Sequence, residues 1–179
     1  MSLDTHLVEA FDEQTDVPID LDRYVRLANL VLERERAGRE AELTIVFVDE
    51  TTMADYHERF LDEPGPTDVM AFPMDDEAPS SGRSPDNSDR GPGSPSGAGS
   101  APPSILGDVL VCPAFAAREA ATRGVEISDE LSLLVVHGVL HLLNYDHAEP
   151  SEAAEMQERQ RVLLAEFASL ETPKREDGR

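Results

Sequence analysis

The chain has 179 residues, a formal net charge of −22 at pH 7 and one cysteine. Its length suits one domain. The sequence holds no run of roughly 18 to 20 apolar residues that would suit a membrane span, and its charged N-terminal segment is unlike a signal peptide. We therefore expect a cytoplasmic protein. The acidic surface repels nucleic-acid phosphates at long range, although it would also suit a basic partner or simply a well-solvated surface.

In the first half of the chain, the apolar patterns predict alternating strands and helices. Asp20 is suited to cap a helix and Gly38 to end it, whereas Pro73 confines its strand to an edge or an end of a sheet. The expected elements are a strand near 4–10, a helix at 21–38, a strand at 42–50, a short helix at 51–61, a turn at 63–68 and a strand at 69–74.

Residues 75–104 differ in composition from the rest of the chain. They consist mainly of Ser, Pro, Gly and Asp and contain no large apolar side chain. Such a segment buries too little surface to offset its ordering entropy. We therefore predict a disordered insertion loop within a single domain that spans residues 1–170, followed by a frayed tail at 171–179.

The second half predicts one more strand and three more helices. Gly107 is expected at a bulge or a close approach, Gly124 at the end of a helix, and Ser128 as the cap of a helix that is apolar nearly all round and therefore buried. The elements are a strand at 105–112, with Cys112 as a small buried residue, and helices at 113–123, 129–143 and 151–170, the last opened by Glu149 and Pro150. Together the elements indicate an α+β fold, with a small four-stranded mixed sheet, about five helices, and the buried helix carrying histidines.

The segment HGVLHLLNYDH (137–147) places three of the five histidines within eleven positions. His137 and His141 are four residues apart and share a helix face, and Gly138 leaves room beside them. Asn144 tolerates the left-handed conformation that ends a helix, so that His147 can turn back toward the pair. The spacing predicts a metal site with three imidazole ligands.

Three neutral imidazoles leave a coordination position open for water, whose pKa zinc lowers to about 7. Metal-dependent peptidases with this histidine spacing carry a glutamate directly after the first histidine, where this chain has Gly138, so we rank peptide hydrolysis lowest. The alternative without a metal is three packing histidines, each of which would need its own hydrogen-bonding partner in an apolar setting. His6 and His57 lie outside the pattern, and we expect His57 to be exposed.

Three segments together resemble the YbeY family of bacterial endoribonucleases, the rRNA maturation factors: GPTDVMAFPMD (65–75), LGDVLVCP (106–113) and HGVLHLLNYDH (137–147). The resemblance implies an α+β fold around a four-stranded sheet, one zinc ion held by His137, His141 and His147, and cleavage of single-stranded RNA. It also implies a role in maturation of the 3′ end of 16S rRNA and in ribosome quality control. The implied partners are rRNA and the small ribosomal subunit, with neither membrane nor DNA.

The chain departs from the family pattern at three positions. Asn144 stands where the family usually has Gly, Ala71 where it has Ser, and Leu61 where a functional arginine is common. Arg59 is the nearest replacement on the same short helix, and we predict it as the catalytic arginine, with a solvated surface role as the alternative. Arg118 and Arg123 are further candidates to line the approach to the metal, whereas Thr67 and Asp68 are expected to form a turn.

The charge of −22 keeps a second hypothesis open. An acidic surface is suited to dock on basic ribosomal proteins, and the protein would then act as a ribosome-assembly factor whose metal is structural. A closed site with four protein ligands would favour this hypothesis, whereas three histidines with an open position favour catalysis.

Overall fold

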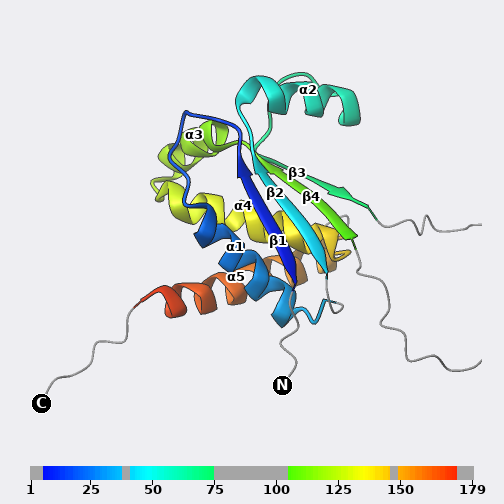
Figure 1. Cartoon of the computed structure of the whole chain (residues 1–179), viewed down its shortest axis with the longest axis vertical. Helices are drawn as coiled ribbons and strands as arrows, with labels where there is room; N and C mark the ends of the chain where they lie inside the picture. The colour runs from blue at the N-terminus through cyan, green and yellow to red at the C-terminus, as the bar shows by residue number, and fades with distance from the viewer. Residues whose placement is uncertain (1–5, 38–40, 75–104, 146–148, 173–179) are drawn as a thin grey trace, which may run out of the picture.

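A computed structural model describes residues 6–37, 41–74, 105–145 and 149–172, and confirms the predicted α+β class (Figure 1). Within these residues the strands are β1 (Leu7–Asp12), β2 (Glu42–Phe47), β3 (Val69–Pro73) and β4 (Ile105–Val111). The helices are α1 (Leu21–Arg34), α2 (Glu50–Leu61), α3 (Pro113–Arg123), α4 (Ile127–Leu142) and α5 (Pro150–Glu171). The predicted loop at 75–104 lies outside the described residues.

The four strands form one mixed sheet in the order β1-β2-β4-β3. β2 pairs in parallel with β1 and β4, whereas β3 runs antiparallel to β4 and forms an edge, as Pro73 predicted. The β2–β4 register shifts where Gly107, with φ +132°, pairs with Leu43. A Cβ atom on Gly107 would collide with the carbonyl oxygen of Phe72, so the predicted bulge and close approach are both confirmed.

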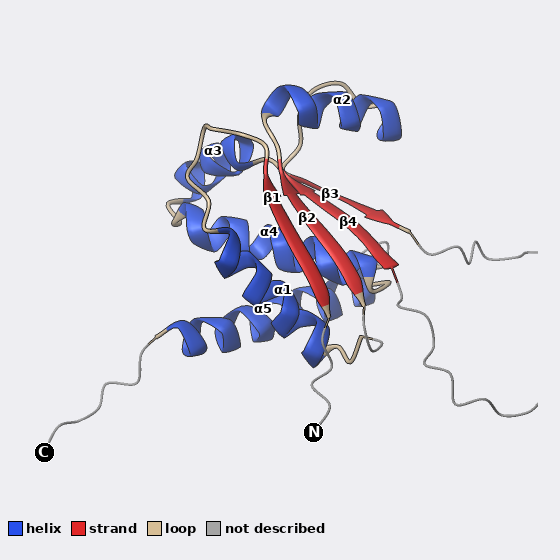
Figure 2. Cartoon of the chain, in the orientation of Figure 1, coloured by secondary structure: helices blue, strands red, loops and turns tan. Residues whose placement is uncertain are grey.

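Two clusters of buried apolar side chains pack against the sheet. In Figure 2, α1, α4 and α5 are grouped together beside the strands, and α2 lies apart from them. The larger core joins one face to α1 and α4, and α5 packs across both helices. α4 contacts β3 and β4 as well as α3, and its buried Val135, Val136, Val139 and Leu140 explain why its sequence is apolar nearly all round. A smaller cluster on the opposite face places Met53 of α2 against Met70, Leu110 and Cys112. No described helix is both long and apolar enough to cross a membrane.

Helix α1 begins as predicted but ends earlier. The Asp20 side chain accepts a 3.1 Å hydrogen bond from the Arg23 N–H, which confirms the cap. The helix ends at Arg34 rather than at Gly38 because Arg36 adopts the left-handed conformation, with φ 53°, and the Ala37 N–H then bonds back to the Leu32 carbonyl. Gly38 itself lies outside the described residues.

Further along the chain, two predicted boundaries are wrong and one is confirmed. The strand expected at 42–50 ends at Phe47, because the Asp49 side chain accepts from the Thr52 N–H at 2.7 Å and starts α2 at Glu50. Ser128 does not cap α4; the helix already begins at Ile127, with Glu126 as the preceding residue. The start of α5 is confirmed, since Glu149 and Glu152 form a capping box around Pro150.

Candidate metal centre and substrate cleft

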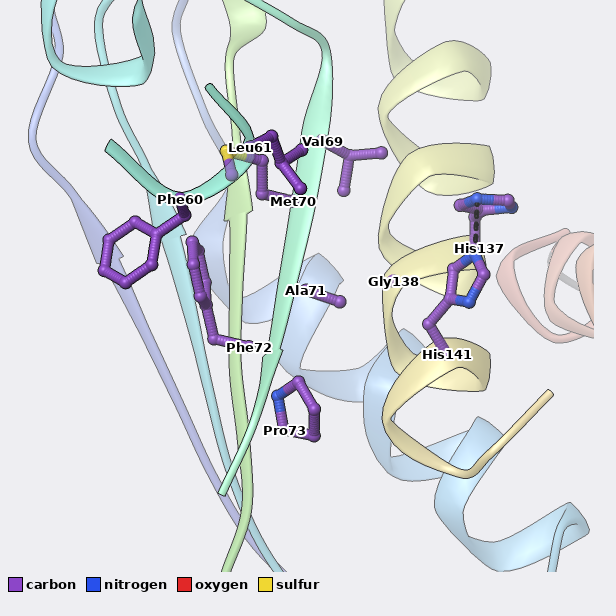
Figure 3. A pocket seen from close by; sticks show the side chains of 10 residues that line it. All are labelled: Phe60, Leu61, Val69, Met70, Ala71, Phe72, Pro73, His137, Gly138 and His141. Atoms are coloured by element: carbon purple, nitrogen blue, oxygen red, sulfur yellow. Dashed lines mark hydrogen bonds between the residues drawn. The ribbon is translucent and has the colours of Figure 1, made fainter. Parts of the chain in front are cut away.

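His137 and His141 lie one turn apart on α4, with their rings nearly perpendicular (Figure 3). The ring centroids are 4.5 Å apart, and the two Nε2 atoms face each other at 3.0 Å. Both side chains are half-buried, and both line the first cavity described below. The predicted pairing of these two histidines is therefore present.

The facing nitrogens suit a zinc ion. Two Zn–N bonds of about 2.0–2.1 Å at a tetrahedral angle separate their nitrogens by about 3.3 Å, close to the separation of the two Nε2 atoms. Imidazole nitrogen is also a preferred zinc ligand. The predicted third ligand, His147, lies outside the described residues, and among those that are described no group of three His, Cys, Asp or Glu side chains surrounds a common point.

The end of α4 has the left-handed residue that the sequence predicted. Asn144 is left-handed, with φ 66°, and the Tyr145 N–H bonds back to the Leu140 carbonyl at 3.0 Å. The Tyr145 hydroxyl then donates a 2.6 Å hydrogen bond to Glu35, at the end of α1, and this bond raises the pKa of Tyr145 to about 12. Arg159 of α5 forms an ion pair with the same Glu35 carboxylate. Three elements thus fix the backbone immediately before the predicted ligand.

Gln160 of α5 lies behind His137 and was not predicted from the sequence. Its Nε2 atom is 3.4 Å from His137 Nδ1, and only 7% of the residue is exposed. A half-turn of the amide presents its oxygen instead, which can accept a hydrogen bond from Nδ1–H when Nε2 binds a metal. The sequence feature that could have pointed to Gln160 is its position in the apolar stripe of α5, between Met156 and Leu163.

An apolar cavity of about 560 Å³ opens beside the two histidines. It is lined by Phe60 and Leu61 of α2, the whole of β3, and His137, Gly138 and His141 of α4 (Figure 3). No charged side chain is among these lining residues. Gly138 serves the helix packing as well as the cavity, because a Cβ atom there would lie 2.5 Å from Val109 Cγ1 in the core.

A second cavity, of about 570 Å³, lies on the α5 side of His137. Its lining comprises Leu133 and His137 of α4 and, from α5, Ala153, Met156, Gln157, Gln160, Arg161 and Leu164. Among the described residues that line these two cavities, Arg161 carries the only positive charge. It forms a 2.6 Å ion pair with Glu158 and remains 68% exposed. His137 therefore stands between an apolar cavity and one with a cationic rim.

The predicted arginines lie elsewhere on the described surface. The Arg59 side chain is 65% exposed and pairs with Asp55 at 3.2 Å, and Arg59 lines neither cavity. Arg118 pairs with Glu50, and Arg123 pairs with the buried Glu130. Leu61, at the position where an arginine is common in the family pattern, does line the first cavity.

His57 is not exposed, contrary to our expectation. Its side chain is 13% exposed, and Nδ1 lies 2.8 Å from the Gly65 carbonyl oxygen, so the imidazole holds the turn that leads into β3. This contact was not visible in the sequence because it depends on how the turn folds back on α2. Asp68 behaves as predicted: it accepts hydrogen bonds from the Thr67 hydroxyl and from the Val69 N–H.

Comparisons with known proteins agree with the motifs. The family model described as "Endoribonuclease YbeY" matches residues 9–168. Proteins of that name from Thermobifida fusca and Beutenbergia cavernae are each 46% identical, covering 90% and 86% of this chain and 96% and 93% of their own lengths. One from Mycobacterium sp. (strain KMS) is 44% identical over 87% of this chain and 81% of its own.

The fold has a solved counterpart. The solution structure of TM1509 from Thermotoga maritima superposes with a TM-score of 0.57 at 21% identity, covering 97% of this chain and 99% of that one. This likeness shows the fold alone, whereas the sequence matches extend over the strands, the histidine helix and most of α5. The chain belongs to the endoribonuclease YbeY family, whose substrate is RNA.

Proposed function

We propose that this protein is a zinc-dependent, single-strand-specific endoribonuclease that acts in the cytoplasm on the 3′ end of 16S rRNA and in ribosome quality control. The observation that carries the proposal is the pair of Nε2 atoms, 3.0 Å apart, at the wall of an open cavity. Membership of an endoribonuclease family supports RNA as the substrate. The proposed partners are single-stranded rRNA, the small ribosomal subunit and its basic proteins.

Individual residues have distinct roles in this proposal. His137 and His141 hold the ion through Nε2, and His147 is the proposed third ligand. Gln160 orients the His137 ring from behind through Nδ1. When bound, zinc supplies a Lewis acid that stabilises negative charge at the scissile phosphate. The apolar walls of the first cavity limit water around the reacting groups and so strengthen electrostatic interactions there.

Positive charge near the phosphate is proposed to come from an arginine. Arg161 is the stronger candidate because it lines the cavity beside His137, whereas Arg59 is paired with Asp55 on the outer surface of α2. Each is tested by substitution with Met, which keeps an apolar stem and removes the charge. If Arg161 acts on the phosphate, Arg161→Met lowers kcat by about tenfold or more and Arg59→Met does not. The reverse result would restore the role predicted for Arg59.

The central experiment is cleavage of a single-stranded RNA that carries the 3′ region of 16S rRNA. Wild type, His137→Ala and His141→Ala are purified identically, their bound zinc is quantified, and a duplex of the same sequence is the specificity control. Cleavage of the single strand by wild type, with none by folded variants that lack zinc, supports the proposal. Equal cleavage by all three would mean that the histidines are not catalytic.

The acidic surface makes a structural alternative testable in the same samples. With a charge of −22, the protein suits docking on basic ribosomal proteins. An intact RNA in every reaction, together with zinc-dependent unfolding and co-sedimentation with small subunits, would favour an assembly factor with a structural metal. Zinc-dependent peptide cleavage would favour a peptidase, which we rank last.

A further inference from the structure

Three aromatic side chains form a cluster on the far side of the edge strand from the histidines. The aromatic cluster consists of Tyr56 and Phe60 of α2 and Phe72 of β3. Phe60 stacks nearly parallel to Tyr56, with centroids 5.9 Å apart, and meets Phe72 edge-on at 5.0 Å. Although these contacts fix the ring, Phe60 is 57% exposed. An aromatic ring held in place and open to solvent is a preorganised surface for another flat group.

The aromatic cluster is continuous with the histidine site. Phe60 and Phe72 line the same cavity as His137 and His141. In Figure 3, Ala71 points from β3 toward α4, whereas Phe72 and Phe60 lie on the opposite side of that strand. The two phenylalanines also line a further cavity of about 360 Å³ on their own side of the sheet. A ligand that crosses the edge of β3 therefore contacts both the aromatic rings and the histidines.

The charges of the residues that line these two cavities argue against RNA binding there through its phosphates. Among the described residues, none that lines the cavity shared with the histidines is charged, and the charged residues that line the further cavity are Glu13 and Asp108. Phosphates gain no cationic partner from these lining residues, and the two carboxylates repel them. Arg59, whose guanidinium carbon lies 6.0 Å from the centroid of the Phe60 ring, already forms an ion pair with Asp55. Bases, in contrast, are flat and apolar on their faces and stack on aromatic side chains. Among RNA conformations, only unpaired and unstacked nucleotides offer such a face.

We propose that Phe60, supported by Tyr56 and Phe72, is a base-stacking subsite for an unpaired nucleotide near the cleaved bond. This inference rests on the proposed function and adds where the RNA is held and why a single strand is selected. Stacking at a distance from the reacting phosphate acts on substrate binding, so Phe60 affects KM more than kcat. Because few phosphates are neutralised at this subsite, binding through it has a shallow dependence on salt.

The test measures binding and cleavage of a single-stranded RNA with 2-aminopurine at successive positions. Binding is measured in EDTA, so that the RNA stays intact, and cleavage is measured with the zinc-loaded enzyme. Phe60→Ala removes the ring and Phe60→Leu keeps an apolar side chain without a ring. Phe11→Ala is the matched control, because Phe11 is a 48% exposed phenylalanine on β1 at the opposite edge of the sheet.

We expect Phe60→Ala to raise Kd and KM by at least about fivefold, the lower end of what one stacked base contributes. Phe60→Leu recovers less than half of that loss, and Phe11→Ala matches wild type. At one probe position, 2-aminopurine fluorescence changes on binding to wild type but not to Phe60→Ala. The preference for single strand over duplex falls in the Phe60 variants, while their melting temperatures remain close to that of wild type.

Several results would overturn the inference without touching the proposed function. If wild type cleaves and Phe60→Ala has an unchanged Kd and KM, then the aromatic cluster is not an RNA subsite. Full recovery by Phe60→Leu would mean that apolar area, not stacking, matters. Wild-type dimers that dissociate in Phe60→Ala, with RNA affinity unchanged, would assign the surface to a second copy. Failure of the proposed function is separate, since wild type with zinc would then leave the RNA intact.

Discussion

The Tyr145 hydroxyl donates a 2.6 Å hydrogen bond to Glu35 Oε2 and so joins the segment after α4 to the end of α1. Tyr145→Phe removes only this hydroxyl. We expect the variant to lose about 1 kcal/mol of unfolding free energy, because a hydrogen bond to a charged, partly buried carboxylate is lost. Urea denaturation measures the change. Zinc affinity should fall as well, since the backbone that leads to His147 becomes less constrained, and an unchanged affinity would show that Glu35 has no part in placing that ligand.

Gln160 provides a test of the metal site that does not depend on RNA. Its amide faces His137 Nδ1 at 3.4 Å. Gln160→Leu keeps the volume and removes both polar atoms, so we expect zinc to bind about tenfold more weakly, in line with other residues that orient a ligating histidine. Gln160→Glu supplies a carboxylate acceptor for Nδ1–H and should restore the affinity. Competition with a chelator measures both, and equal affinities for wild type and the Leu variant would contradict the positioning role.

In Gly138→Ala, a gain in helix propensity competes with a steric clash in the core. Alanine favours the helix by about 1 kcal/mol over glycine, but its Cβ would lie 2.5 Å from Val109 Cγ1. Val109 is fully buried and β-branched, so it cannot turn away without disturbing the core. Overpacking of this kind costs about 1–3 kcal/mol, and we therefore expect net destabilisation in urea. A more stable variant would mean that α4 moves away from the sheet at little cost.

Asn144 tests the backbone conformation at the end of α4. With φ 66°, this residue is left-handed, a conformation that costs most side chains about 1–2 kcal/mol. Asn144→Ala should lower the unfolding free energy by about 1 kcal/mol, whereas Asn144→Gly should leave it unchanged or raise it slightly. Thermal and urea unfolding of the two variants distinguish a backbone role from a side-chain role, because loss in both variants would mean that the amide itself is needed.

Acid pH should weaken the cap of α2. The Thr52 N–H donates to the Asp49 carboxylate and holds its pKa below the ordinary value of 3.8. A lowered pKa in the folded state stabilises the protein above pH 3.8, and this stabilisation is lost as the pH falls through the lowered value. Asp49→Asn still accepts from Thr52 but does not titrate. Urea unfolding from pH 7 to pH 3 should therefore show the advantage of wild type over Asp49→Asn shrinking below about pH 4.

The fold was predictable where one local pattern dominates. The apolar surface of α4 predicted its burial, Pro73 predicted an edge strand, and Asn144 predicted a left-handed helix end. The end of α1 was not predictable in this way, because arginine is a poor choice for the left-handed position that Arg36 occupies. The neighbouring Arg34 and Glu35 form ion pairs with α5, and these contacts are between residues far apart in the sequence.

The residues of the candidate site likewise include some that were predictable from a local pattern and some that were not. His137 and His141 were predictable because a spacing of four places two side chains on one helix face. Gln160, Arg161 and Phe60 reach the cavities only through the packing of α5 and α2, which no short motif encodes. His57 was misjudged for the same reason, since its partner is the backbone of a turn eight residues further along the chain.

The register of β3 and β4 has a practical consequence. Pro73 pairs directly with Gly107, so the sheet holds the two ends of the intervening segment side by side. Halving or doubling the length of a flexible connection between fixed ends changes the closure free energy by only about 0.6 kcal/mol. We therefore expect the position between β3 and β4 to be permissive for protein engineering: an affinity tag, a fluorescent reporter or a shortened linker should replace the loop predicted at 75–104 while the strand pairing stays the same.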